Sequence, residues 1–523
     1  MASEQDLPAV RRQLQDWEHR RRRILDHPVA NNDLTVLLAN TVHLFVCLDG
    51  HSGYVDASRF TSYRNALHSD AERLSSALPA PWGAALREHA SGSAGKREED
   101  ALLSAVEEIR TRLSADRIDL LRHLGVPAAI GPDAAFARLI GGLDGSGTRT
   151  KLAAAWDRLS HKRLPDLAEA VDRVVEARWR RARAAGHASP LAATVRDSLL
   201  DESAAEEFLT EYLMRAVATH RDLEAMVGEA LGCPDDPMNH FAAYLKTLAS
   251  GHRMPLIPLS ACVDTAAQVM QTVFGHNVAR TDEEDAILLT LTSSDGLVGV
   301  IQVDCVPATG AHPPDVPVNL PIGRALARCR NTGQGRVLTF EAARILMHEL
   351  GHAVNHVLLE PRRPAPTGLE YLPVERLENL SAWFETWVLH PDFAARVPEP
   401  ERSGIPLAAR IRSTEFLATQ LQRAVVAMMD FRVHRTETTV AGAFQQVCEQ
   451  FGVTGRCHLG DLLPYFGAPV FRVHPGLAGL CYLWSYAFGA EAARLADPRD
   501  VLRSCLDPDL PSVRPDIAAI GSV

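Results

Sequence analysis

The sequence predicts a mainly α-helical protein that also contains one small β-sheet. Up to about residue 250, apolar residues recur at helical spacing, as in 101–113, 152–159 and 164–185. Short breaks rich in Gly, Pro and Asp separate these segments, for example at 125–127. Helical spacing returns near residue 336 and continues to about residue 495.

The β-sheet is predicted from two apolar runs that flank a turn. Residues 287–291 and 297–303 are rich in Ile, Leu, Val and Thr, and Ser-Ser-Asp-Gly at 293–296 lies between them. An Asp-Gly pair between two such runs is a strong signal for a β-hairpin. We therefore expect an N-terminal helical region over 1–250 and a second region over 251–523, which contains the hairpin and the motifs below.

The composition is that of an ordinary globular protein, and the charge limits its partners. The 523 residues are enough for roughly three domains. The net charge of −11 argues against a general nucleic-acid-binding protein. The basic run Arg20–Arg23 is expected to be a solvated helix face, because acidic residues lie nearby. The sequence does not indicate an oligomeric state.

Neither a secretory signal nor a membrane span is expected. The first thirty residues contain no apolar stretch, and apolar runs such as 44–48 are far too short to cross a bilayer. The nine cysteines are scattered singly, which is typical of reduced thiols in a cytoplasm. We therefore expect a cytoplasmic protein without a cysteine metal site.

The segment 339–359 carries the strongest chemical motif. Thr339 suits the N-cap of a helix that begins at Phe340 and ends near Leu359, before Pro361. Within this helix two histidines, His348 and His352, are four residues apart and project from one face. Both imidazoles can therefore bind a single Zn²⁺ ion.

Glu349 directly follows the first histidine, so we expect its carboxylate beside the metal rather than on it. There it can act as the general base toward a water molecule. Such a motif can arise by chance in a chain with 21 histidines. The neighbours, however, indicate a buried helix: Leu346, Met347, Leu350 and Val354. Two histidines and a glutamate would be costly there without a partner, which favours metal binding over simple packing.

A second helix, between Pro373 and His390, is expected to supply the third ligand. Pro373 suits the first turn of a helix. Glu375, Glu378 and Glu385 would share one face of it, at spacings of three and seven. We predict Glu378 as the third ligand of a His₂Glu site with an open position for water. Glu385 is expected to orient a ligand histidine. The alternative, for both Glu385 and Glu375, is a carboxylate that is simply exposed to solvent.

Other polar residues in this part of the chain receive weaker interpretations. His356 continues the histidine stripe but is expected to be packed or to contact a ligand residue. The arginines at 328, 330 and 336 are expected in a solvated loop. Mn²⁺ or Co²⁺ in place of zinc remains an alternative, because availability as well as ligands decides which metal is bound.

Taken together, these motifs resemble the thimet oligopeptidase and oligoendopeptidase F family of zinc metallopeptidases. The specific features are His-Glu-Leu-Gly-His at 348–352, Glu378 thirty residues after His348, and Glu-Thr-Trp at 385–387. Looser similarities lie at 181–187, 303–307, 337–341, Thr367-Gly368 and Tyr482-Leu483-Trp484. The resemblance covers about residues 170 to 495.

The resemblance implies a helical, two-lobed metallopeptidase with a deep central channel and a small sheet beside the zinc helix. One zinc ion would be held by His348, His352 and Glu378, with Glu349 as the general base. The edge strand of the sheet would hold the backbone of a short peptide by β-augmentation.

One stretch departs from the family pattern. In the family, a histidine and two or more tyrosines precede the Tyr-Leu-Trp box and donate hydrogen bonds to the oxyanion. Here Tyr482 is kept, but Pro475 or Gly476 and Gly479 stand where the upstream tyrosines would be. We predict Tyr482 and His474 as oxyanion or substrate contacts, with Tyr465 as a weaker candidate. Losing one oxyanion donor can cost about a hundredfold or more in rate.

Three functions follow in order of preference. The first is zinc-dependent hydrolysis of short peptides. The second is a specialised hydrolase for one small peptide-like metabolite or precursor peptide, which the altered tyrosine stretch suggests. The third is a catalytically silent scaffold, against which Glu349 argues because a scaffold has no use for a base beside the metal. The sequence does not indicate the cleavage preference or whether cleavage is internal or terminal.

Overall fold

The computed structural model of the chain describes its residues in several stretches. These are 93–126, 132–143, 146–232, 241–283, 286–294, 296–305, 325–329, 336–359, 372–467, 471, 474–507, 510 and 512–518. They fall into two compact units. The sheet unit contains Pro255–Ser403 and Ala492–Val513, and the helical unit contains Ala94–Met254, Gly404–Glu491 and Arg514–Val523.

These units interleave along the chain, which differs from the two consecutive regions that the sequence indicated. The expected boundary near residue 250 lies close to the step from Met254 to Pro255. The chain then re-enters the helical unit at Gly404 and the sheet unit at Ala492. The chain returns to each unit because helices far apart in the sequence pack together. Local changes in residue composition do not reveal such packing.

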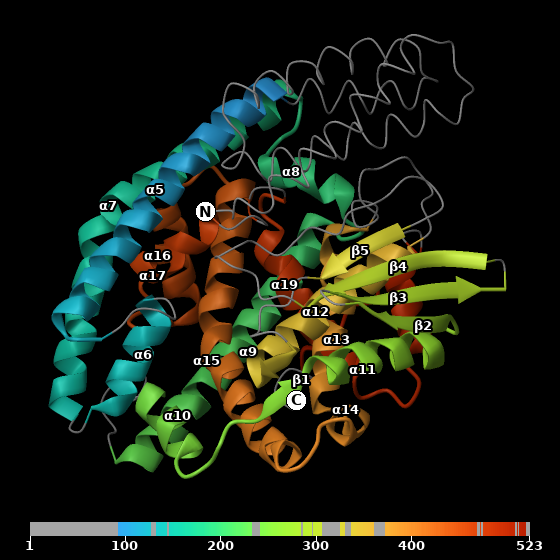
Figure 1. Cartoon of the computed structure of the whole chain (residues 1–523). Helices are drawn as coiled ribbons and strands as arrows, with labels where there is room; N and C mark the ends of the chain where they lie inside the picture. Colours follow the sequence, from blue (N-terminus) through green and yellow to red (C-terminus); the bar gives the residue numbers. More distant parts are fainter. Residues whose placement is uncertain are drawn as a thin grey trace, which may run out of the picture. The chain divides into compact units, whose positions relative to one another are not determined.

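The helical unit is built from helices of very different lengths (Figure 1). They are α5 (Ser93–His123), α6 (Pro132–Gly142), α7 (Ser146–Ala184), α8 (Pro190–Thr194), α9 (Glu202–Leu231), α10 (Phe241–Ala249), α15 (Glu401–Arg435), α16 (Val440–Phe451), α17 (Leu459–Leu462) and α19 (Ala478–Ala492). The predicted segments 152–159 and 164–185 form one continuous helix, α7, which passes through Pro165. Gly186, with a φ of 80°, follows its end.

Buried polar contacts fix the later helices of this unit against the earlier ones. The indole of Trp179 in α7 donates to the carbonyl of Val433 in α15, at 2.9 Å. Arg178 forms a buried ion pair with Glu99 of α5 at 2.7 Å. Its Nη1 donates to His434 Nε2 of α15 at 3.1 Å. These contacts place 404–491 in the same core as the N-terminal helices.

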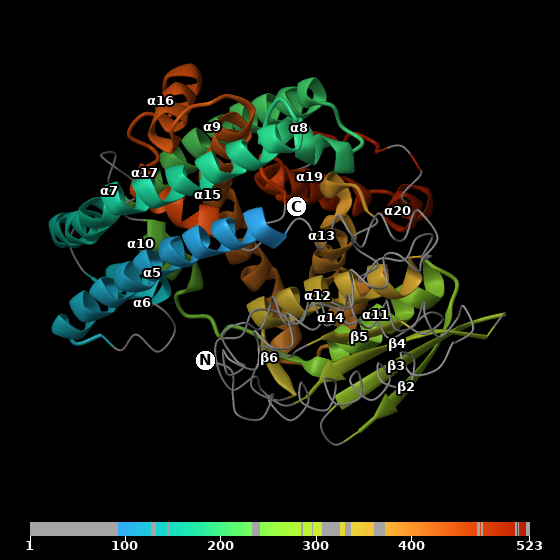
Figure 2. The ribbon, with the colours of Figure 1, turned by 90° about the horizontal axis from the view of Figure 1, so that it is seen from above.

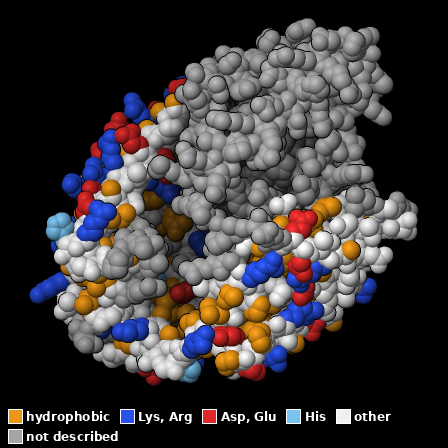
Figure 3. Space-filling view, viewed as in Figure 1, with side chains coloured by type: hydrophobic (Ala, Val, Ile, Leu, Met, Phe, Trp, Pro, Cys, Tyr) orange, Lys and Arg blue, Asp and Glu red, His pale blue; other side chains and the backbone are white. Residues whose placement is uncertain are grey.

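The surface of the helical unit mixes both signs of charge. On α5, Arg110 pairs with Glu107 and Arg112 pairs with Glu108, each within one helical turn. Figure 3 shows basic and acidic side chains interspersed over the visible described surface. Within the described part of the chain, no helix is both long and apolar enough to span a membrane.

The sheet unit contains the strands and the motif helices. Its elements are β1 (Leu256–Pro258), α11 (Leu259–Thr272), β2 (Asn277–Asp282), β3 (Ala286–Ser293), β4 (Gly296–Asp304), β5 (Ala325–Cys329), β6 (Val337–Thr339), α12 (Phe340–Leu358), α13 (Asn379–Thr386), α14 (Pro391–Ala395) and α20 (Arg499–Leu506). The mainly helical fold with a small sheet is therefore confirmed.

The predicted hairpin is formed by β3 and β4. They pair in an antiparallel register that closes at Ser293 and Gly296, and β2 extends the sheet on the β3 side. On the other side β5 pairs with β4 in the parallel direction, which gives the order β2-β3-β4-β5. Buried side chains of β3 and β4 face the core, and α11 and α12 lie along one face of the sheet (Figure 2).

Helix α12 begins and ends close to where the sequence predicts. The hydroxyl of Thr339 accepts a hydrogen bond from the amide of Ala342 at 3.1 Å, which makes Thr339 the N-cap. Glu341 lies in the first turn, where the helix dipole favours an acid. Leu350, Gly351 and Val354 are all buried, so the helix packs on several sides.

Gly351 allows the closest helix contact near the motif. A Cβ atom added there would lie 2.5 Å from the Cα of Ser381 and 3.0 Å from both the Leu380 carbonyl oxygen and the Phe384 Cβ. Because two of these are backbone atoms, they cannot move aside without shifting a helix. The absence of a side chain at Gly351 thus sets the distance between α12 and α13.

The segment that carries the glutamates is not the single helix that the sequence indicated. A 3-10 turn covers Val374–Arg376, and α13 begins at Asn379, with Glu378 as its N-cap residue. The helix is interrupted at Glu378, whose φ of −105° and ψ of 3° lie outside the helical range. The three glutamates therefore do not share one helical stripe.

Glu375 is buried rather than solvated, which corrects one alternative. Its carboxylate accepts from the hydroxyl of Ser512 at 2.5 Å. Arg376, next to it, is also buried and donates to the carbonyls of Ser504 at 2.8 Å and Asp507 at 3.0 Å. These contacts attach the segment after α20 to the turn that precedes Glu378.

Substituting Gly351 tests the packing of α12 on α13. We expect Gly351→Ala to lower the free energy of unfolding by about 1–3 kcal/mol, because the methyl group overpacks the contact. Gly147→Ala is the matched control, since nothing lies within 4 Å of an added Cβ at this helical position. Thermal and denaturant unfolding measure both, and equal stability of Gly351→Ala and the wild type would contradict the packing argument.

Candidate metal centre

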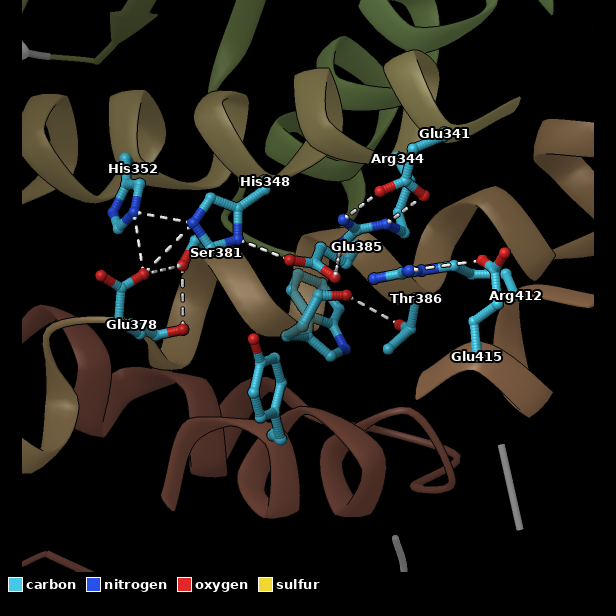
Figure 4. Close-up of polar contacts among 12 residues, drawn as sticks. Glu341, Arg344, His348, His352, Glu378, Ser381, Glu385, Thr386, Arg412 and Glu415 are labelled. Atoms are coloured by element: carbon cyan, nitrogen blue, oxygen red, sulfur yellow. Dashed lines mark hydrogen bonds and ion pairs between the residues drawn. The ribbon is translucent and has the colours of Figure 1, made fainter. Parts of the chain in front are cut away.

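Three side chains converge in the sheet unit, two from α12 and one from the start of α13 (Figure 4). The Nε2 atoms of His348 and His352 are 3.1 Å apart. Glu378 Oε2 lies 3.2 Å from the first of these nitrogens and 3.0 Å from the second. Among the described residues, these three form the group of His, Cys, Asp or Glu side chains that could hold a metal ion.

The donor atoms fit a small tetrahedral cation. Bonds of about 2.0–2.1 Å to such an ion place its ligand atoms about 3.3 Å apart. The three observed separations of 3.0, 3.1 and 3.2 Å are close to this value. Two imidazole nitrogens and a carboxylate oxygen are also a donor set that zinc commonly takes.

The protonation of His348 strengthens the case for a cation. Its Nδ1 donates to Glu385 Oε1 at 2.7 Å, because a carboxylate can only accept. The opposite nitrogen, Nε2, faces His352 and Glu378, and it offers a lone pair to an ion once it has lost its proton. The two Nε2 atoms and Glu378 Oε2 surround one space, which suits a positive charge, either a proton or a metal ion. The residues therefore fit a metal.

Glu385 links the centre to two further charges. Its second carboxylate oxygen pairs with Arg344 Nη1 of α12. Arg344 in turn pairs with Glu341 at 2.8 Å. Figure 4 shows this row running along α12 from Glu341 to His348. Glu385 is thus held by a cation on one side while it orients a predicted ligand on the other.

The pKa shifts follow from these contacts. Burial lowers the pKa of His348, but hydrogen bonds to Glu378 and Glu385 outweigh it and raise the pKa to about 10. Burial raises the pKa of Glu378, yet the two histidines bring it well below its usual value. Glu385 shows the same balance, with His348 and Arg344 lowering its pKa. Without a metal, a proton is therefore held among these groups.

Glu349 lies beside this centre on α12 and is half-buried. Burial raises the pKa of Glu349, the two histidines lower it, and the nearby carboxylates Glu378 and Glu385 raise it further. The result is a carboxylate with more affinity for a proton than an ordinary glutamate. The charges of all three predicted ligands affect the pKa of Glu349.

Two supporting residues were not predicted. Arg344 lies four residues before His348, so the i, i+4 spacing could have placed both on one helix face. The Ser381 hydroxyl lies 2.9 Å from the backbone oxygen and 3.1 Å from Oε2 of Glu378, so it can brace the carboxylate. The pairing of Arg344 with Glu385 depends on the packing of α12 on α13, whereas Ser381 and Glu378 lie three residues apart on the same segment.

Other predicted residues lie elsewhere. His356 is buried in α12. Tyr482, in α19, and His474 belong to the helical unit, so their contact with substrate stays a prediction. Burial lowers the pKa of His474 to about 4, which keeps its imidazole neutral at pH 7.

The basic run at 20–23, Thr367-Gly368 and Arg330 lie outside the described residues. Arg328 lies in strand β5 rather than in the predicted loop, because the backbone there pairs with β4. Arg336 is exposed, as predicted, and donates to the carbonyl of Glu283 at 3.1 Å.

The fold and the centre together define a helical protein with a His-Glu-x-x-His helix and a downstream glutamate, as in mononuclear metal-dependent hydrolases. No protein-family model matches the chain. Over 172 residues the chain is 23% identical to Oligopeptidase A of Salmonella typhimurium (strain LT2). This match spans 31% of the chain and a quarter of the relative's length. It confirms the predicted resemblance to the oligopeptidases.

Two solved structures were also compared. A Chlamydophila abortus protein assigned as a peptidase gives a TM-score of 0.49 at 12% identity, over 94% of this chain and 85% of that one. A Bacillus anthracis protein assigned as an oligoendopeptidase F gives 0.42 at 12% identity, over 95% and 92%.

Glu385→Gln tests how the predicted ligand His348 is held. An amide cannot accept from both His348 and Arg344, so we expect the affinity for Zn²⁺ to fall about 10–100-fold. Competition against a zinc-binding dye measures it. Glu341→Gln, which changes the exposed end of the same row, should have a much smaller effect. Equal affinities of Glu385→Gln and the wild type would mean that Glu385 does not orient the site.

The pKa of His348 predicts a proton-linked metal affinity. Because this pKa is raised to about 10 in the metal-free protein, His348 is protonated at neutral pH and must lose its proton to bind an ion. Affinity for Zn²⁺ should therefore rise with pH, by roughly tenfold per unit between pH 6.5 and 8.5. Calorimetry in buffers of different ionisation enthalpy should show proton release. An affinity independent of pH would contradict the hydrogen-bonded arrangement.

Proposed function

We propose that this protein is a zinc-dependent peptidase that hydrolyses short peptides. The observation that carries the proposal is the convergence of His348, His352 and Glu378, with Glu349 beside them. The similarity to Oligopeptidase A supports peptides as the substrate class, although that match covers only a quarter of the relative.

Each residue of the centre has a distinct proposed role. His348, His352 and Glu378 would hold the ion. A bound zinc ion supplies Lewis acidity and lowers the pKa of water. Glu349 would take the proton from the attacking water and pass it to the leaving amine. The raised pKa of Glu349 suits this role, because a stronger base accepts the proton more readily.

Further contacts with the substrate are proposed from the family resemblance. Tyr482 and His474 would donate hydrogen bonds to the oxyanion or bind the substrate. The neutral imidazole of His474 keeps one ring N–H as a donor at pH 7. We also propose that strand β5, at the edge of its sheet, pairs with the peptide backbone, and that a channel admits only short peptides.

The altered tyrosine stretch favours a second candidate function. Gly479 and either Pro475 or Gly476 stand where the family has tyrosine donors, so a specialised hydrolase for one peptide-like compound is the alternative. Gly476 has a φ of 86°, and a Cβ there would lie 2.9 Å from Leu191. A tyrosine would not fit at this position, so the difference from the family extends to the backbone conformation.

The cytoplasmic location stays a prediction.

Glu349→Gln separates catalysis from metal binding. We expect hydrolysis of a mixed short-peptide library to fall by about 10²–10⁴-fold, because the amide cannot take a proton. Zinc stoichiometry should stay the same, since Glu349 is not a proposed ligand. Mass spectrometry of the peptides and metal analysis of the protein measure the two. Glu341→Gln is the control for the same change on the same helix.

The wild type should lose activity with a chelator and regain it with zinc. If the wild type and Glu349→Gln are both inactive despite stoichiometric zinc, general peptidase activity is contradicted. Cleavage of a single peptide in the library would instead favour the specialised hydrolase.

A further inference from the structure

Arg376 is a buried cation in the turn that precedes α13. Its side chain is 1% exposed, and all three nitrogens of its guanidinium donate hydrogen bonds. Nη1 donates to the carbonyls of Ser504 and Asp507, at 2.8 and 3.0 Å. Nη2 donates to the carbonyl of Leu510, and Nε donates to the hydroxyl of Ser512 at 2.9 Å. One guanidinium therefore fixes these four residues, which we call the tail residues.

The hydroxyl of Ser512 joins this cation to the acid next to it in the sequence. It accepts from Arg376 Nε at 2.9 Å and donates to Glu375 Oε1 at 2.5 Å. Glu375 is fully buried, like its neighbour. Two buried charges are costly unless their hydrogen-bonding groups are paired, and the tail residues supply that pairing. The position of the turn Val374–Arg376 is therefore coupled to the tail residues.

Helix α20 brings the tail residues to this place. It contacts both α12 and α13, the two helices that carry the predicted metal ligands. Its buried side chains are Leu502, Ser504 and Cys505, so one face of this short helix packs into the core of the sheet unit. The tail residues, the turn and the predicted ligands all belong to this one unit.

The predicted ligand Glu378 is fixed from two sides of the chain. On the C-terminal side its carbonyl accepts from the amide of Ala382 at 2.9 Å, as part of α13. On the N-terminal side only Leu377 separates it from Arg376. Consecutive Cα atoms are about 3.8 Å apart, so a displaced turn would displace Glu378 as well. A metal ligand has to stay within about 0.5 Å of its productive position.

We propose that Arg376 is a positioning residue for Glu378, and that the tail residues act through it on the affinity for Zn²⁺. Glu385 orients the side chain of His348, whereas Arg376 would fix the backbone from which Glu378 projects. The inference rests on the proposed function, because the same centre would hold the zinc ion. It adds a part of the chain far from the metal motif to the support of that centre.

Ser512→Ala tests this role in the full-length protein. It removes the hydroxyl between Arg376 and Glu375 but keeps the contacts to the carbonyls, so the fold should persist. We expect the affinity for Zn²⁺, measured by competition against a zinc-binding dye, to fall about tenfold. Ser512→Thr keeps a hydroxyl and should restore most of it. Ser403→Ala is the matched control, because this exposed hydroxyl donates to the carbonyl of Pro400 in the same unit, at 2.7 Å.

A double-mutant cycle with Glu378→Gln separates positioning from general stability. If the tail residues act through Glu378, Ser512→Ala should change the zinc affinity of Glu378→Gln by less than about twofold. An equal loss in both backgrounds would indicate a general loosening and contradict the proposal. Arg376→Lys should weaken zinc binding more than Ser512→Ala, because an ammonium group cannot reproduce the planar fork. Thermal unfolding shows whether this variant folds, and if it does not, the cycle with Ser512→Ala decides.

The outcomes distinguish this inference from the proposed function. If the wild type binds zinc and Ser512→Ala binds it equally well, the positioning role is wrong while the peptidase function stands. If the affinities change as expected but the wild type cleaves no peptide, the positioning role stands and the proposed function fails. A wild type that binds no zinc would overturn both.

Discussion

The close approach of α12 to α13 is the constraint on which the candidate centre depends. Gly351 lies between the two histidines in sequence, and its missing side chain lets the backbone of Ser381 lie against α12. That distance brings Glu378 to within 3.0–3.2 Å of two imidazole nitrogens on another helix. A larger residue would separate the donor atoms even if every one of them were retained.

Charge compensation is the second condition that the centre satisfies. Two carboxylates, Glu378 and Glu385, are held together with His348 in a half-buried place. His352 and His348 lower the pKa of Glu378, and His348 and Arg344 lower the pKa of Glu385, so both carboxylates remain ionised. Such a set is costly if any member is unpaired, and here each carboxylate has a basic partner. The arrangement is therefore organised around a positive charge at its centre, which a metal ion can supply.

The two units contribute differently to the proposed function. The sheet unit contains the predicted ligands and Glu349, whereas Tyr482 and His474 belong to the helical unit. The metal centre is supported by distances, while the proposed substrate contacts rest on the family resemblance.

The sequence by itself determined the elements whose signals are local. The cap at Thr339, the face shared by His348 and His352, and the turn at 293–296 depend only on residues a few positions apart. Those features are all present in the structure, because helical and strand periodicity place near neighbours without help from the rest of the chain.

Only the tertiary structure decided what depends on residues far apart in sequence. The break at Glu378 replaced the expected continuous helix, and Glu375 turned toward Ser512 instead of solvent. The interleaving of the units likewise depends on how helices pack. Tertiary packing brings together side chains that lie far apart in the sequence, so helical or strand spacing cannot predict their contacts. A buried charged side chain is stable only where such a contact supplies a partner of opposite charge or a hydrogen bond.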